Sequence, residues 1–265
     1  MDNVALVTGA SSGIGRELAR LHAEQGRDLV VVARRLEALE ALREELEAKH
    51  RVQVMPLSYD LTQANAREDL AAKLEQEGIL VEYLINNAGF GLAGRFHDQS
   101  WSQLSGMIAL NITALTHLTH LFLPKMVEWG AGRILNVSST AGFMPGPLQA
   151  VYFATKAYVN SFTQAVATEL EGTGVTVTAL CPGPVDTEFA ERANFSADGE
   201  MFARARTPRY TAQRGYDAME AGDREVISEP SLNVLIKGVL PFLPARQVNN
   251  LVKKMQASSI ESEQN

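Results

Sequence analysis

The sequence predicts an α/β protein with a doubly wound parallel sheet, a Rossmann fold, and two observations lead to this prediction. Short apolar runs rich in Val, Ile and Leu are typical of strands that are buried on both faces. Longer segments with leucines at helical spacing separate these runs. Helices of about a dozen residues or more between strands are crossover connections, which make the joined strands parallel. The chain has 265 residues, 46% of them hydrophobic, which is enough for one such domain.

The expected elements alternate along the chain. The first strand is the apolar run Val4–Thr8, and further strands are expected at residues 28–33, 52–57, 81–85, 133–137, 175–181 and 225–228. Helices are expected at residues 13–25, 36–50, 63–77, 100–129 and 150–171. Leucines at 36, 39, 42 and 46 define the buried side of the second helix, and its glutamates define a solvated side. The fourth helix is expected to be interrupted near Asn111 and Pro124.

Composition and charge limit the partners and the compartment. The net charge of −7 argues against a nucleic-acid partner. The single cysteine, Cys181, permits no internal disulfide and fits a reducing compartment. The chain starts without a basic segment or a small-residue cleavage site, and no stretch reaches the ~18 apolar residues of a membrane span. We therefore expect a cytoplasmic protein without a transmembrane segment.

A glycine-rich loop between the first strand and the first helix is the first functional candidate. Gly9 allows a sharp turn out of the strand, and Gly13 and Gly15 allow close approach of a pyrophosphate and of the sheet. The free N–H groups and the dipole of the helix N-terminus attract phosphates. The loop therefore predicts a dinucleotide cofactor, and a Gly/Ser-rich loop without a ligand is the alternative.

The end of the second strand indicates which dinucleotide binds. Folds of this kind often place an acidic residue there to bind the adenine ribose 2′-hydroxyl. This sequence has Arg34 and Arg35 instead, and guanidinium groups suit a 2′-phosphate. We expect NADP(H) in preference to NAD(H). The alternative is that both arginines are solvated residues of the next helix.

Tyr152 and Lys156 are the candidates for acid–base chemistry. Their spacing of four places both side chains on one face of a helix. A phenol ordinarily loses its proton near pH ~10, and a neighbouring ammonium group lowers that pKa. The same spacing also occurs in ordinary amphipathic helices, so the other motifs decide its meaning.

Taken together, these motifs resemble those of the short-chain dehydrogenase/reductase family over residues 3–189. The family's T-G-x-x-x-G-x-G pattern matches Thr8 to Gly15, N-N-A-G matches residues 86–89, and P-G-P-V-x-T matches residues 182–187. Y-x-x-x-K matches Tyr152 to Lys156, and Ser139 precedes Tyr152 by the family's usual thirteen residues, which selects it over Ser138.

The resemblance implies a role for each matching residue. Tyr152 would exchange a proton with the substrate oxygen, Ser139 would hydrogen-bond that oxygen, and Lys156 would bind the nicotinamide ribose. Asn111 would anchor a water molecule in a proton relay. Asp60 and Leu61 would contact adenine and Thr187 the carboxamide. The full set of expected cofactor-binding residues is Gly9, Ser11, Ser12, Gly13, Ile14, Arg34, Asp60, Leu61, Asn87, Ala88, Gly89, Tyr152, Lys156, Pro182, Gly183, Val185 and Thr187.

The remaining sequence predicts the substrate side. We expect one domain over residues 1–265, with a cofactor-binding and catalytic core at 1–189, a substrate lid and C-terminal helices at 190–257, and a polar tail at 258–265. Four apolar lid residues favour an apolar substrate pocket, namely Phe189, Phe195, Met201 and Phe202. The apolar stretch 231–244 is expected to cap that pocket or to contact a partner subunit, with a membrane surface as the alternative.

Two further expectations concern the histidines and the oligomeric state. His117 and His120 lie three residues apart without a third ligand nearby, which favours packing over a metal site. The resemblance implies a homodimer or homotetramer.

The main hypothesis is an NADP(H)-dependent carbonyl reductase or alcohol dehydrogenase with a largely apolar substrate. The alternatives are an NAD(H)-linked hydroxysteroid-type dehydrogenase and a non-catalytic dinucleotide sensor.

Overall fold

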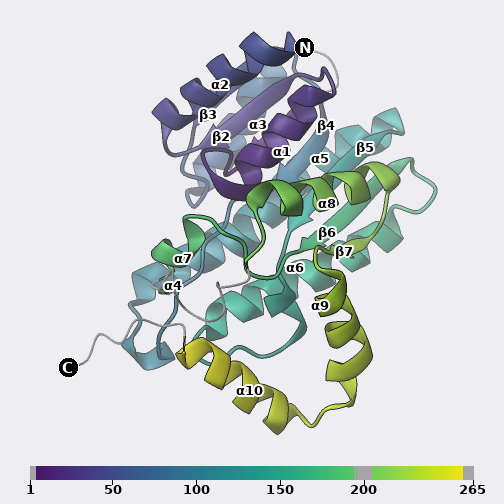
Figure 1. The fold of residues 1–265 in the computed structure, drawn as a ribbon. Coiled ribbons are helices and arrows are strands. Elements are labelled where there is room, and N and C mark those ends of the chain that lie inside the picture. The colour runs from purple at the N-terminus through teal and green to yellow at the C-terminus, as the bar shows by residue number, and fades with distance from the viewer. Residues whose placement is uncertain (1–3, 194, 196–204, 259–265) are drawn as a thin grey trace.

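Seven parallel strands form one sheet in the order β3-β2-β1-β4-β5-β6-β7 (Figure 1). The computed structural model describes residues 4–193, 195 and 205–258. The strands are β1 (Val4–Thr8), β2 (Leu29–Ala33), β3 (Val54–Ser58), β4 (Val81–Asn86), β5 (Gly132–Val137), β6 (Val175–Cys181) and β7 (Glu225–Ile227). The predicted doubly wound sheet is confirmed. The strand order reverses between β1 and β4, where folds of this kind bind their ligands.

Helices cover both faces of the sheet (Figure 1). On one face lie α1 (Gly13–Glu24), α2 (Leu36–His50) and α8 (Pro208–Ala221), which share an apolar core with the sheet. On the other face lie α3 (Ala64–Gln76), α5 (Leu115–Trp129) and α6 (Ala150–Glu169). All five residues of β1 are buried, as expected for a central strand between two helical layers.

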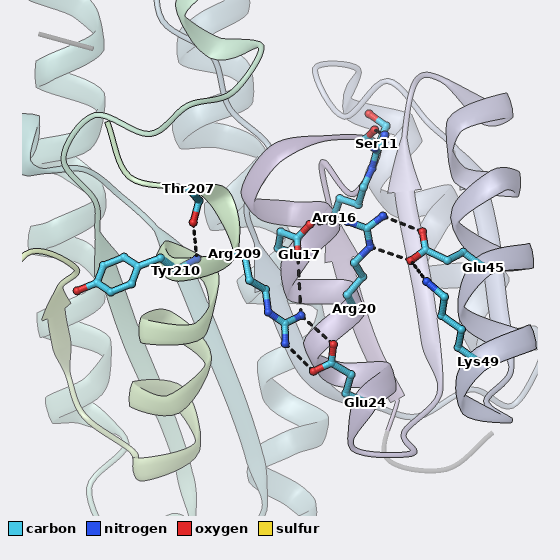
Figure 2. A network of polar contacts seen from close by, with 10 residues as sticks. All are labelled: Ser11, Arg16, Glu17, Arg20, Glu24, Glu45, Lys49, Thr207, Arg209 and Tyr210. Carbon is cyan, nitrogen blue, oxygen red and sulfur yellow. Dashed lines mark hydrogen bonds and ion pairs between the residues drawn. The ribbon is translucent and has the colours of Figure 1, made fainter. Parts of the chain in front are cut away.

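Ion pairs align α1 with its neighbours (Figure 2). Arg20 of α1 donates to both carboxylate oxygens of Glu45 in α2, at 3.1 and 2.7 Å. Arg209 of α8 forms the same two-bond pair with Glu24, at 2.8 and 2.6 Å. Such partly exposed pairs contribute about 0.2–1 kcal/mol each. They therefore fix the orientation of the three helices more than they stabilise the fold.

The helix expected at residues 100–129 is continuous. It comprises α4 (Trp101–Ile108), a π-helical turn (Ala109–Ala114) that contains Asn111, and α5. The interruption expected near Asn111 is this wider turn. The interruption expected near Pro124 is absent, because Pro124 lies within α5.

The same helix corrects one expectation from the sequence. Residues Trp101–Trp129 are long and apolar enough, by length and composition, to cross a membrane, with a mean hydropathy of 1.3 over the best window. The expectation that no stretch qualifies is therefore wrong. The helix packs on the sheet, because α5 contacts β4 and β5 and Thr119 accepts a hydrogen bond from Asn86. Within the domain, 33% of the most apolar window is buried.

The C-terminal part contains elements that the sequence analysis did not resolve. After the short α7 (Phe189–Arg192), α8 joins the sheet layer, so this part of the expected lid belongs to the core. Next come α9 (Pro230–Val234), a π-helical turn (Leu235–Val239), a 3-10 turn (Leu240–Phe242) and α10 (Ala245–Ala257). In α10, Val248, Val252 and Gln256 form one buried stripe. Met201, Phe202 and most of the polar tail lie outside the described residues.

Candidate active site

The glycine-rich loop packs against the end of β4. Gly9 and Gly13 adopt φ of +68° and +55°, which L side chains rarely adopt. A Cβ on Gly15 would lie 2.3 Å from Nδ2 of Asn87 and 2.5 Å from the oxygen of Gly9. Asn87 also donates to the carbonyl of Thr8 at 3.0 Å. The loop after β1 and the loop after β4 are therefore locked together without room for side chains.

The start of α1 suits a phosphate group. The side chain of Ser12, the residue before the helix, makes no capping hydrogen bond, so the first N–H groups of α1 keep their donor capacity. The Arg16 guanidinium holds the loop by donating to the carbonyl of Ser11 (Figure 2). Positive φ at the glycines, free N–H groups and a helix dipole together fit a dinucleotide pyrophosphate.

The two arginines after β2 differ in their contacts. Arg35 donates to Oγ of Ser11 at 3.2 Å and forms an ion pair with Glu188 at 2.9 Å. Arg34 lines the same cavity, and no partner of its side chain is present among the described residues. The Arg35 guanidinium thus stands beside the glycine-rich loop, and Arg34 belongs to the wall of the same cavity. Glu188 is a competing anion that the sequence analysis did not identify.

Asn111 connects three segments behind the site. Its side-chain oxygen accepts from the N–H of Phe90 at 3.1 Å, and its Nδ2 donates to the Phe90 carbonyl at 2.9 Å. The same Nδ2 donates to Oγ1 of Thr155 at 3.1 Å. Thr155 in turn donates to the carbonyl of Tyr152 at 2.7 Å. The π-helical turn thereby fixes α6, which carries the tyrosine, against the loop after β4.

Ser139, Tyr152 and Lys156 line one cavity. Oγ of Ser139 donates to the carbonyl of Pro182 at 3.3 Å, and Ser139 influences the pKa of Tyr152. Nζ of Lys156 lies 5.8 Å from the centroid of the Tyr152 ring. Ser138 is buried and instead donates to the carbonyl of Lys156 at 3.1 Å. The geometry favours Ser139 over Ser138 as the serine that faces a ligand.

Burial dominates the protonation of this pair. It raises the pKa of Tyr152 to about 12, and the hydrogen bond with Ser139 offsets part of that increase. It lowers the pKa of Lys156 to about 8. The lysine was expected to lower the pKa of the tyrosine. In the protein without cofactor that expectation is wrong, because burial raises the pKa and the group that lowers it is Ser139.

A buried carboxylate supports the turn after β6. Oε2 of Glu229 accepts from the N–H of Gly183 at 3.1 Å and from the hydroxyl of Ser228 at 2.8 Å. The preceding residue, Pro182, accepts from the N–H of Thr140 at 2.9 Å as well as from Ser139. Glu229 thus stabilises the turn after β6, and that turn binds the loop that carries Ser139 and Thr140. No sequence pattern marks this residue, because its role depends on contacts 46 positions apart.

The cavity has a volume of about 700 Å³ and joins all of these segments. Its walls contain Ser139 and every residue that the sequence analysis expected to bind cofactor, while Asn111 stands behind them. The cavity extends to an apolar region under α10, lined by residues such as Phe153, Val248 and Val252. Phe189 and Phe195 line it as expected.

The two histidines considered for a metal site do not form one in the part of the chain that the structure describes. Nδ1 of His117 accepts from Nε of Arg67 at 3.0 Å, which ties α5 to α3. No group of three or more His, Cys, Asp or Glu side chains with metal-binding geometry occurs among the described residues.

Comparisons with known proteins find relatives over most of the chain. The chain is 40% identical to sulfoacetaldehyde reductase 2 of Chromohalobacter salexigens over 191 residues, which are 71% of this chain and 75% of that protein. It is 38% identical to the NADP-dependent 3-hydroxy acid dehydrogenase of Salmonella typhi over 199 residues, 74% and 78% of the two chains.

A solved structure gives the same result in three dimensions. The short-chain dehydrogenase from Sphingobium yanoikuyae in complex with NADPH superposes with a TM-score of 0.81 at 31% identity, covering 91% of this chain and 96% of that one. The sequence pattern described as short chain dehydrogenase matches residues 3–197. The chain therefore belongs to the short-chain dehydrogenase family of oxidoreductases.

Proposed function

We propose that this protein transfers a hydride between NADP(H) and a carbonyl group or secondary alcohol on a largely apolar substrate. The observation that carries the proposal is a single cavity with Ser139, Tyr152 and Lys156 in its wall. One end of the cavity is the glycine-rich loop, and the other is an apolar region under α10. A cofactor and a substrate bound there would meet at the tyrosine.

Residues at the carboxyl ends of the strands would hold the cofactor, which supplies the hydride when bound. The N–H groups at the start of α1 would bind the pyrophosphate. Arg34, Arg35 and Ser11 would bind the 2′-phosphate, which is the reason to prefer NADP(H). Asp60 and Leu61 would contact adenine. Lys156 would bind the nicotinamide ribose, and Thr187 the carboxamide.

Tyr152 would supply the proton during reduction. Burial raises its pKa to about 12, so the phenol is protonated at neutral pH and able to donate to a carbonyl oxygen as negative charge develops there. The Ser139 hydroxyl would hydrogen-bond the same oxygen. In the oxidative direction Tyr152 would accept the proton, with Asn111 anchoring a water molecule in the relay.

The walls of the cavity indicate the kind of substrate. Among the described lining residues the cationic groups are Arg34, Arg35, Lys156 and Arg192. The first three belong to the proposed cofactor side, and Arg192 is paired with Glu188. No free cation is therefore present at the apolar end of the described cavity. This favours an uncharged, apolar ketone over the small anionic substrates for which the two relatives are named.

Two further properties belong to the same proposal. We expect a homodimer or homotetramer that uses α5 and α6, because Tyr158 of α6 is 37% exposed while its ring stacks on Phe162. We also expect a cytoplasmic location.

The test is consumption of NADPH and NADH by the purified protein over a panel of ketones, aldehydes, steroids and acyl ketones. Turnover with NADPH on apolar ketones supports the proposal. Turnover with NADH alone, on steroids, supports the hydroxysteroid-type alternative. Tight NADPH binding without turnover on any substrate supports the dinucleotide sensor.

A further inference from the structure

Two buried glutamine side chains line the cavity, and each has a buried polar atom without a hydrogen-bond partner among the described residues. Gln149 and Gln256 are each only 4% exposed, and both belong to the wall of the cavity. Nε2 of Gln149 and Oε1 of Gln256 are buried and make no hydrogen bond among the described residues. Most buried amide groups in proteins are paired, so each of these is an exception that needs an explanation.

Gln149 lies at the start of the helix that carries Tyr152. It is the residue before α6, three positions ahead of Tyr152 in the sequence, and both residues line the cavity. Residues in this position often cap the helix through their side chain, but the Gln149 side chain makes no capping hydrogen bond. The preceding Leu148 adopts φ of +70°, a strained conformation for a branched residue. Such strain is typical of segments that hold a functional side chain.

Gln256 belongs to a different element, the helix α10. It continues the buried stripe of α10 after Val248 and Val252, and those two valines pack with Tyr152 and Phe153. An apolar residue would extend this stripe without cost, whereas an unpaired amide loses its hydrogen bonds to water. The two amides therefore lie in the wall of the cavity among apolar residues, one at the start of α6 and one on α10.

We propose that Gln149 and Gln256 recognise uncharged hydrogen-bonding groups on the substrate, which is a bulky, mainly apolar ketone carrying at least one additional hydroxyl or carbonyl group. The inference rests on the proposed reductase function and narrows its substrate class. An amide offers both a donor and an acceptor, so it suits a hydroxyl or a second carbonyl. A site built to bind such a group discriminates strongly against the analogue that lacks it, because the protein group is then left unpaired.

The test compares 2-decalone with a set of hydroxy-2-decalones that differ in the position of the hydroxyl. The value of kcat/KM for NADPH-dependent reduction is measured for the wild type, Gln149→Met and Gln256→Met. Gln247→Met is the control, because Gln247 lies exposed on the same helix as Gln256 and outside the cavity wall. We expect the wild type to favour at least one hydroxydecalone over decalone by tenfold or more. This ratio should fall at least tenfold in Gln149→Met or Gln256→Met and stay unchanged in Gln247→Met.

Several results would overturn the inference. One is a wild type that reduces decalone and every hydroxydecalone equally well, and another is a preference that survives in both cavity variants. A second readout separates recognition from a structural role. If the amides serve only the substrate, each methionine variant unfolds at the same or a higher denaturant concentration than the wild type.

Failure of the proposed function gives a different pattern. In that case the wild type consumes no NADPH with any ketone. Calorimetric binding of decalone and hydroxydecalones to the NADPH-loaded protein then tests the amides alone. Tighter binding of a hydroxydecalone that is lost in Gln149→Met or Gln256→Met supports recognition by the amides. Equal binding of all the ketones rejects it.

Discussion

Nζ of Lys156 lies 2.8 Å from the carbonyl oxygen of Val137, the last residue of β5. Lys156 is only 6% exposed, and burial lowers its pKa to about 8. One carbonyl partner does not compensate an ammonium group for the loss of water. The lysine is therefore held in place at a cost in stability, as expected for a residue kept for its chemistry.

Replacing this lysine should stabilise the protein and abolish its activity. In Lys156→Met, a deficit of roughly 3 kcal/mol that follows from the lowered pKa disappears, and a hydrogen bond from a charged donor, worth about 1.5–3 kcal/mol, is lost. We expect the free energy of unfolding without cofactor to rise by up to about 1.5 kcal/mol at pH 7. Urea denaturation measures this change, and NADPH consumption measures the loss of turnover.

The difference in unfolding free energy between the wild type and Lys156→Met should depend on pH, and this dependence tests whether the lowered pKa of Lys156 causes it. The native pKa of Lys156 lies below its ordinary value of 10.5, so between about pH 8 and 10.5 the unfolded chain binds more protons than the native one. The wild type should therefore gain stability relative to Lys156→Met as pH rises through that interval. Tyr152 titrates in both proteins and cancels from the comparison. A difference that stays constant from pH 7 to 10.5 would contradict the assignment.

Tyr152→Phe tests the proton transfer with little change in packing. The phenyl ring keeps the contacts of Tyr152 with Phe153 and Phe189. We expect kcat for ketone reduction to fall by about 10²–10⁴-fold, since a positioned general acid contributes that much. The Kd of NADPH, followed by fluorescence, should change by less than about tenfold, because the phenol offers the cofactor at most one hydrogen bond. Wild-type activity in this variant would contradict proton transfer by Tyr152.

Much of the fold follows from periodicity, because burial on both faces leaves a continuous apolar run in the sequence. The run Val4–Thr8 is a strand with the expected bounds, and so is Val175–Cys181. The helix α8 was missed, although its ends carry clear signals. Thr207 caps it through its side chain, Pro208 begins it, and Gly222 ends it with φ of +75°. Its mixed composition concealed a buried face that only packing on α1 and β6 reveals.

Some residues of the candidate site could likewise be predicted from the sequence, and others could not. Residues in fixed loops at strand ends, such as Gly9 and Ser139, were predicted because their spacing along the chain carries the information. Glu188 and Glu229 were not, because their importance depends on partners 153 and 46 positions away. The pKa of Tyr152 was also misjudged, since the sequence shows a neighbouring charge but not the depth of burial.

Glu229 should prove essential to the turn after β6. In Glu229→Ala, the N–H of Gly183 and the hydroxyl of Ser228 lose their acceptor inside the protein. We expect a loss of about 1–3 kcal/mol in unfolding free energy, measured by urea denaturation. Because the same turn binds Ser139, kcat/KM for reduction should fall as well. The control is Glu229→Gln, which keeps one acceptor oxygen and should lose clearly less; equal losses in both variants would point to the charge instead.

The contact between Arg35 and Glu188 makes the cofactor preference testable in two directions. Arg34 lacks a partner among the described residues, whereas Arg35 is held at 2.9 Å by Glu188. If both arginines bind the 2′-phosphate, Arg34→Ala should reduce the NADPH over NADH preference in kcat/KM by about tenfold or more, since a charged hydrogen bond is worth about 1.5–3 kcal/mol. An unchanged preference for NADPH over NADH would mean that Arg34 is a solvated residue that does not bind the 2′-phosphate.

The opposite change is expected from Glu188→Gln. Removing the carboxylate frees the Arg35 guanidinium and removes a negative charge near the phosphate, so NADPH should bind more tightly and NADH should be unaffected. The Arg35 and Glu188 side chains are 45% and 41% exposed, which limits the gain to roughly threefold. Titration of NADPH at low and high salt checks the origin, because screening should erase an electrostatic gain. If Glu188→Gln instead weakens NADPH binding, the ion pair serves to position Arg35 for the phosphate and does not compete with it.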